Sequence, residues 1–167
     1  MKVIVIYESV FGNTEKVARS IGKAFTSEGG SNVHHVDQVT PDQLKDVELL
    51  IVGSPTQKFQ AMRAAKNFIA KMPSGSLKGI NVAAFDTRIS TGDVKSGFLI
   101  YMVNLFGYAA EPLARKLKRK GGELIAEPEG FYVGGTKGPL KEGELERAEK
   151  WGQQIKRMIE EQKQTVV

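Results

Sequence analysis

The sequence VIVIYESVFGNTEKVARSI, residues 3–21, joins an apolar run to a helix-like run through a short polar segment. The β-branched run from Val3 to Tyr7 has the composition of a buried strand, and the pattern from Glu15 onward has the spacing of a helix. The segment between them contains Ser9, Val10, Phe11, Gly12, Asn13 and Thr14. The sequence therefore predicts a strand, a tight loop and a helix in that order.

The predicted loop has the chemistry of a phosphate site. The first N–H groups of a helix lack partners within the helix and point, with the helix dipole, toward the preceding loop. Ser9, Asn13 and Thr14 add short polar side chains, and Gly12 lets a ligand approach the backbone without meeting a Cβ. The chain has neither GxxxxGK[ST] nor GxGxxG, so this loop resembles neither a nucleoside-triphosphate loop nor a dinucleotide fingerprint. We predict a terminal phosphate held by neutral donors; the alternative is an ordinary connection capped by Thr14.

Length and composition limit the class of protein. The chain has 167 residues, 41% of them hydrophobic, which predicts one domain with a substantial core. It has no Cys, which excludes disulfides, thiolate-bound metal clusters, a cysteine nucleophile and a flavin tethered through sulfur. Redox chemistry would therefore need a non-covalent organic cofactor. No apolar run approaches the roughly 18 residues of a membrane span, so we expect a cytoplasmic protein.

The basic character of the chain has two interpretations. The formal net charge is +5, the sequence pI is about 9.4, and part of the excess lies in the run from Arg115 to Lys120. This run is either a docking face for an acidic partner, nucleic acid or an anionic surface, or the solvated end of a helix before Gly121 and Gly122. The second interpretation is favoured, and we expect no nucleic acid. We also expect no metal site, because His34 and His35 point to opposite faces of a predicted strand.

Strand-like and helix-like segments alternate along the chain, which predicts a parallel sheet with helices on both faces. The ligand of such a sheet lies beyond the carboxyl ends of its strands. The polar segments after the first, third and fourth strands should therefore meet. The predicted strands are residues 3–7, 33–36, 49–53, 81–85 and 124–126, with 131–133 on the last edge. The predicted helices are residues 14–28, 61–72 and 142–162, together with a short helix at 41–46 and a helix that ends at residue 120.

The chain resembles the flavodoxin family in three motifs, which are VIVIYESVFGNTEKVA, LLIVGSPT and AAFDTR. The resemblance implies a flavodoxin-like α/β fold, a doubly wound five-stranded parallel sheet of order 2-1-3-4-5 with helices on both faces, and FMN as cofactor. It implies that Ser9, Phe11, Gly12, Asn13 and Thr14, with the backbone of Val10, hold the 5′-phosphate. It further implies that Ser54, Pro55, Thr56 and Gln57 line one side of the isoalloxazine, and that Asp86, Thr87 and Arg88 border the other side and the ribityl chain.

The chain also departs from the family pattern. Many flavodoxins have an aromatic residue in place of Gln57 and a glycine in place of Lys58, although Phe59 could supply a ring. An ammonium at Lys58 would favour the anionic, fully reduced flavin, so we predict less of the one-electron-reduced form than in a typical flavodoxin. The apolar segment Phe98 to Phe106 starts a helix, covers the flavin or forms a subunit interface. Flavodoxins that shuttle electrons are typically acidic, whereas this chain is basic.

Three functions are consistent with the sequence. The first is an FMN-binding redox protein that exchanges electrons with a partner protein. The second is an NAD(P)H:quinone oxidoreductase of flavodoxin-like fold, and the third is a binding or regulatory module without flavin. The sequence contains no motif for a dedicated acid, base or nucleophile, so any catalysis would be the chemistry of the cofactor.

Overall fold

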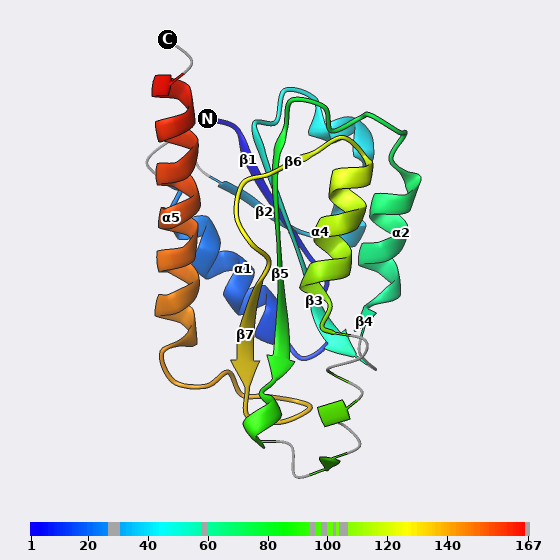
Figure 1. Ribbon diagram of the computed structural model, residues 1–167, viewed down its shortest axis with the longest axis vertical. Coiled ribbons are helices and arrows are strands. Elements are labelled where there is room, and N and C mark those ends of the chain that lie inside the picture. The colour runs from blue at the N-terminus through cyan, green and yellow to red at the C-terminus, as the bar shows by residue number, and fades with distance from the viewer. Residues whose placement is uncertain are drawn as a thin grey trace.

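A computed structural model describes residues 1–26, 31–57, 60–93, 96–97, 100–101, 103 and 107–165. Its centre is a sheet in the order β2-β1-β3-β5-β6, in which β4 pairs with β3 and β7 pairs with β5 (Figure 1). All the pairs are parallel except β3 with β4. Because β6 and β7 both occupy the place beside β5, the predicted order 2-1-3-4-5 is confirmed. The strands are β1 (Val3–Tyr7), β2 (Ser31–His35), β3 (Leu49–Gln57), β4 (Gln60–Ala61), β5 (Asn81–Ile89), β6 (Glu123–Leu124) and β7 (Glu129–Val133).

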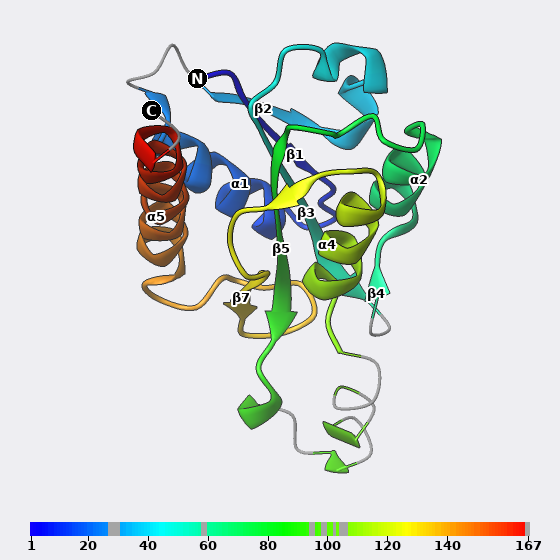
Figure 2. The same ribbon diagram turned by 45° about the horizontal axis from the view of Figure 1, so that its top comes forward.

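Helices cover both faces of the sheet. Helices α1 (Asn13–Lys23) and α5 (Glu144–Thr165) pack on one face, and α2 (Arg63–Lys71) and α4 (Ala110–Arg119) pack on the other (Figure 1). Among the described residues are the short 3₁₀ segments η2 (Val36–Gln38), η3 (Pro41–Leu44) and η4 (Thr91–Asp93). Segment η4 lies beyond the end of β5, away from the helices (Figure 2).

The central strands are apolar on both faces because both faces are buried. In β1, Val3, Val5 and Tyr7 belong to the core cluster under α1 and α5, whereas Ile4 and Ile6 belong to the cluster under α2 and α4. This alternation is the period of two expected of a strand. It explains why the run from Val3 to Tyr7 contains no exposed residue.

Two glycines allow backbones and rings to come close. A Cβ on Gly152 of α5 would lie 2.8 Å from the carbonyl oxygen of Ile21 and 2.9 Å from the Cβ of Ala24. A Cβ on Gly53 of β3 would lie 2.0 Å from Cζ of Phe85 on the neighbouring strand. The packing of α1 against α5 and the packing of the Phe85 ring over β3 therefore both depend on a missing side chain.

Several predicted boundaries were wrong. Helix α1 ends at Lys23 and not near Glu28, because the N–H groups of Ala24 and Phe25 bond three residues back, to Ile21 and Gly22, and tighten the last turn. Phe25 is thereby fully buried. The predicted stop at Gly29 and Gly30 lies outside the described residues.

The strands beside the predicted site are longer than expected. Strand β3 runs to Gln57 and β5 to Ile89, because their ladder continues through the pairs Ser54 with Asp86 and Pro55 with Thr87. The expected loop after Gly53 is therefore largely strand, and its end pairs antiparallel with β4. The helix predicted at 61–72 begins at Arg63 and ends at Lys71, and the closing helix predicted at 142–162 spans Glu144–Thr165. The last edge of the sheet, predicted at 124–126 and 131–133, consists of the two separate strands β6 and β7.

No helix in the described ranges is both long and apolar enough to cross a membrane. The same residues contain no cluster of three or more His, Asp or Glu side chains suited to a metal ion. On β2, His34 and His35 are paired with Ile6 and Tyr7 of β1, and the ring of His35 packs edge-on at 5.5 Å from the ring of Tyr7.

Candidate functional site

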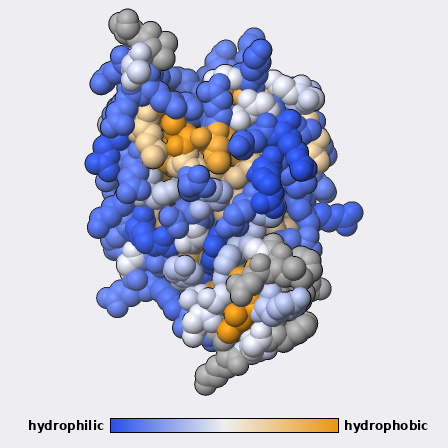
Figure 3. Space-filling view, in the orientation of Figure 1, coloured by the Kyte–Doolittle hydropathy of each residue, from blue (hydrophilic) through white to orange (hydrophobic). Residues whose placement is uncertain are grey.

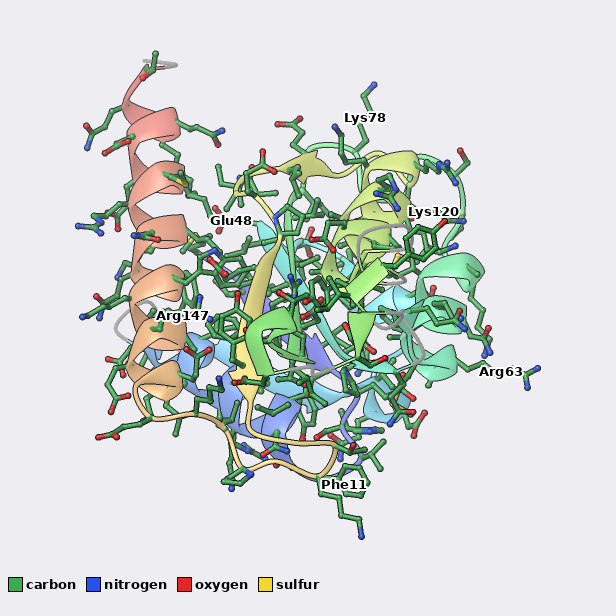
Figure 4. All side chains as sticks on the ribbon, turned by 60° about the horizontal axis from the view of Figure 1, so that its bottom comes forward. Phe11, Glu48, Arg63, Lys78, Lys120 and Arg147 are labelled. Atoms are coloured by element: carbon green, nitrogen blue, oxygen red, sulfur yellow. The ribbon has the colours of Figure 1, made fainter. Side chains whose placement is uncertain are left out.

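A cavity of about 430 Å³ lies at the carboxyl ends of β1, β3, β5 and β7. This size and place are typical of a small-molecule site in an open parallel sheet. The exposed side chain of Phe11 projects from the molecule at this end (Figure 4). The described residues that line the cavity are Ser9, Val10, Phe11, Asn13, Thr14, Pro55, Thr56, Gln57, Thr87, Arg88, Ile89, Val133, Gly135 and Thr136.

The segment between β1 and α1 leaves the amino end of α1 open. Gly12 is the N-cap residue with φ of 81°, a conformation that glycine adopts at little cost, and no side chain caps the helix. The N–H of Gly12 donates to Ser9 Oγ at 3.1 Å, and the Gly12 carbonyl accepts from the N–H of Lys16 at 3.1 Å. Ser9 accepts in this bond, so its own hydroxyl hydrogen is available to a ligand. This is the geometry of an anion site at a helix N-terminus.

Thr14 links the first turn of α1 to the sheet. Its Oγ1 lies 2.9 Å from Oγ1 of Thr87 on β5, and both side chains are almost fully buried. One hydroxyl donates and the other accepts, which leaves one hydroxyl hydrogen for a further bond. Since both residues line the cavity, this hydrogen can serve a ligand there.

Asn13 lines the cavity, but its amide is already engaged. Nδ2 of Asn13 donates to the carbonyl oxygen of Lys137 at 3.1 Å, across 124 positions of sequence. Gly138 lies so close that a Cβ there would be 2.5 Å from the same Nδ2. The segment after β7 is therefore part of the cavity wall, a role that the sequence analysis missed. The run of glycines at 134, 135 and 138 was the signal that could have indicated it.

Ser54 and Asp86 do not line the cavity, although the resemblance to the flavodoxin family implied that both lie beside the isoalloxazine. Ser54 is fully buried; its Oγ accepts from the N–H of Met62 at 2.9 Å, just before α2. Asp86 is also fully buried and accepts from the N–H of Ala110, in the first turn of α4, at 2.8 Å. Their side chains position the helices on one side of the site, and direct contact with a flavin stays a prediction.

Arg88 lines the cavity with its charge largely compensated. Its Nε and Nη2 donate to the Asp86 carboxylate at 2.5 and 2.7 Å, and its guanidinium carbon lies 3.8 Å from the centre of the Tyr108 ring. Burial raises the pKa of Asp86, and the bonds from Arg88 oppose that shift by favouring the carboxylate. A Cβ on Gly130 would lie 2.2 Å from Arg88 Nε, so the Arg88 side chain needs this glycine on β7.

The other predicted wall is formed by the end of β3. Pro55, Thr56 and Gln57 line the cavity, and Thr56 Oγ1 accepts from the N–H of Ala109 at 2.9 Å, which joins this strand to the start of α4. Lys58 and Phe59 lie outside the described residues, as do Phe98 and most of the segment up to Phe106. The predicted effect of Lys58 on the flavin and the predicted interface at 98–106 therefore stay predictions.

Comparison with known proteins agrees with this geometry. A family model described as Flavodoxin matches residues 5–151. The chain belongs to the flavodoxin family. It is 25% identical to a flavodoxin of Clostridium saccharobutylicum over 163 residues, which is 96% of the chain and 99% of that relative. It is 30% identical to a flavodoxin of Aquifex aeolicus over 115 residues, which is 64% of the chain. The matched part covers 62% of that relative, less than two thirds of its length.

Solved structures show the same relationship. A flavodoxin from the domain Archaea superposes with a TM-score of 0.69 at 25% identity, covering 95% of the chain and 99% of that structure. Flavodoxin 2 of Bacillus cereus, at 19% identity, shares the fold with a TM-score of 0.73 over 94% of the chain and 99% of that structure. As a flavodoxin, the chain is a flavin-binding electron-transfer protein. The quinone-reductase and flavin-free alternatives are not favoured.

Proposed function

We propose that the flavin of this flavodoxin is FMN and that its 5′-phosphate binds at the amino end of α1. The observation that supports this most directly is the uncapped helix N-terminus facing a cavity that also contains the hydroxyls of Ser9 and Thr14. Among the described lining residues none is acidic, so no carboxylate there repels a phosphate. The donor set therefore fits a phosphate ester held largely by neutral groups.

Two rigid walls suit the ring system. Pro55, Thr56 and Gln57 form one wall, and Thr87, Arg88 and Ile89 form the other. Both walls are strand ends rather than free loops, and both are bonded to α4, by Thr56 to Ala109 and by Asp86 to Ala110. The cofactor supplies one- and two-electron transfer; the chain orients it and limits the access of water to it.

A titration of the flavin-free protein tests the phosphate assignment. FMN, riboflavin and FAD are added separately, and binding is followed by flavin fluorescence and absorbance. We expect FMN to bind much more tightly than riboflavin, because riboflavin lacks the phosphate but has the same ring. Equal affinity for FMN and riboflavin would show that the amino end of α1 does not hold a phosphate.

We further propose that the redox partner is acidic. Helices α2 and α4 together carry seven basic side chains and one acidic side chain, Glu111. The surface over α4 is strongly hydrophilic in Figure 3, and the exposed Arg63 and Lys78 project from the molecule in Figure 4. Such a face attracts an acidic protein and accelerates its association at low salt.

A cytoplasmic location stays a prediction of the sequence.

The partner proposal is tested by electron transfer from a reduced, acidic ferredoxin to the FMN-loaded protein. We expect the bimolecular rate constant to fall as the salt concentration rises. The double variant Lys118→Glu with Arg119→Glu should be slower at low salt than the control with Lys150→Glu and Arg157→Glu on α5. An equal loss in both variants would mean that net charge, and not the face of α2 and α4, steers the partner.

A further inference from the structure

We propose that the segment 134–139 is a second phosphate-binding element, an inference that rests on the proposed FMN site. In this proposal the hydroxyl of Thr136 and the ammonium of Lys137 bind the 5′-phosphate from the side opposite the first turn of α1, and Asn13 holds the segment in place. The phosphate site would then combine neutral donors with one cation.

The segment is a folded turn. The N–H of Gly134 donates to the carbonyl of Pro139 at 2.8 Å, and the N–H of Gly138 donates to the carbonyl of Gly135 at 2.9 Å. Just outside the turn, Val133 forms a bridge with Leu140, and the N–H of Lys141 donates to Tyr132 at 2.9 Å. The turn is thus the closed end of a short hairpin that begins at β7, and its residues have defined positions relative to the cavity.

The turn is docked on the residue that opens α1. Asn13 is 8% exposed, and its Nδ2 donates to the carbonyl of Lys137 at 3.1 Å. Gly138, with φ of 97°, leaves no space for a Cβ beside the Asn13 amide. The contact places the backbone of Lys137 against the first helical residue of α1, directly beside the open N–H groups.

The chemistry of the turn suits a phosphate. Gly135 and Thr136 line the cavity, and Thr136 adds a hydroxyl group to the residues around it. Lys137 is exposed and forms no ion pair among the described residues. Arg88, by contrast, is bonded to Asp86, and Lys141 is paired with Asp93. Lys137 is therefore a cation next to α1 that is available to a dianion, and a lysine ammonium is a strong phosphate donor on a long, adaptable side chain.

The test compares Lys137→Gln and Thr136→Val with the control Lys141→Gln, which removes a lysine four positions further along. For each protein, dissociation constants of FMN and riboflavin are measured by fluorescence at low and high salt, and the melting temperature of the flavin-free form is recorded. Both test positions are exposed, so folding should be unaffected.

We expect Lys137→Gln to weaken FMN binding about fivefold at low salt and less at high salt, because the lost interaction is a screened charge pair. Thr136→Val should weaken FMN binding about threefold to tenfold at both salt concentrations. Riboflavin binding and the melting temperature should not change, and Lys141→Gln should bind FMN like the wild type.

Two negative results have different meanings. If the wild type prefers FMN but neither variant changes its affinity or its salt dependence, the segment 134–139 does not bind the phosphate and the proposed site at α1 stands alone. If the wild type does not distinguish FMN from riboflavin, the phosphate site itself is wrong, and this inference is overturned with it.

Discussion

The buried pair of Thr14 and Thr87 allows the structural and ligand-binding roles of one hydroxyl to be separated. The two Oγ1 atoms are 2.9 Å apart, and the residues are 1% and 4% exposed. Replacing either threonine with valine keeps the shape but leaves the other hydroxyl buried without its partner, which costs about 1–3 kcal/mol of unfolding free energy. Replacing both removes the unpaired group as well, so the double variant should be close to the wild type.

The pair is measured as a double-mutant cycle. Urea unfolding of the flavin-free wild type, Thr14→Val, Thr87→Val and the double variant gives the four unfolding free energies. We expect the double variant to be more stable than the sum of the single effects predicts, by at least about 1 kcal/mol. The same four proteins are titrated with FMN and riboflavin.

The binding data should follow a different pattern from the stability data. Thr14→Val and the double variant lose the hydroxyl nearest the amino end of α1 and should bind FMN about tenfold more weakly, equivalent to about 1.4 kcal/mol, with little change for riboflavin. Thr87→Val retains that hydroxyl and should bind FMN more tightly than Thr14→Val. Additive stability effects would refute the coupling of the two hydroxyls. An equal loss of FMN binding in both single variants would refute the assignment of the phosphate contact to Thr14.

Three further predictions concern the scaffold around the site. Asp86→Asn should lower the unfolding free energy by about 3 kcal/mol, because it leaves the 10%-exposed Arg88 with only its longer ion pair to Glu111, at 3.8 Å. Breaking the exposed pair with Glu15→Gln should cost less than about 1 kcal/mol, and equal losses in urea unfolding would contradict this. Gly53→Ala should cost about 1–3 kcal/mol through its clash with Phe85, and a second change, Phe85→Leu, should cost less in this background than in the wild type. The hydrogen bond from Lys163, together with the backbone N–H of Lys2, holds the pKa of Glu48 below its usual value. Glu48 therefore stabilises the fold above about pH 4.3, and this stabilisation is lost as the pH falls through the lowered pKa. Glu48→Gln should flatten that part of the pH profile of stability by about 0.5 kcal/mol, since Glu48 is 41% exposed, and an unchanged profile would exclude this role.

Local sequence was sufficient for the strand, loop and helix at residues 3–23, whereas the order of the sheet was implied by the resemblance to the flavodoxin family. The apolar runs in β1 and β3, the polar segments that follow them and the helical spacing after Gly12 are all short-range patterns. The anion-binding character of the loop also follows locally, because it arises from the geometry of any helix N-terminus. Ser9 and Thr14 therefore could be identified as candidate phosphate ligands from the sequence.

The tertiary structure decided which side chains face the cavity. Ser54 and Asp86 have the polarity of ligand contacts, but the ladder between β3 and β5 extends past them and turns them toward the starts of α2 and α4. That ladder depends on two strands meeting, and neither strand's own pattern shows how far the pairing continues. The glycines at 134, 135 and 138 indicate a turn but not its place, because the bond that docks the turn on α1, from Asn13 to Lys137, joins positions 124 residues apart. Periodicity and capping are properties of neighbours in the chain, whereas the walls of this site are made by backbone groups that meet only after the sheet has formed.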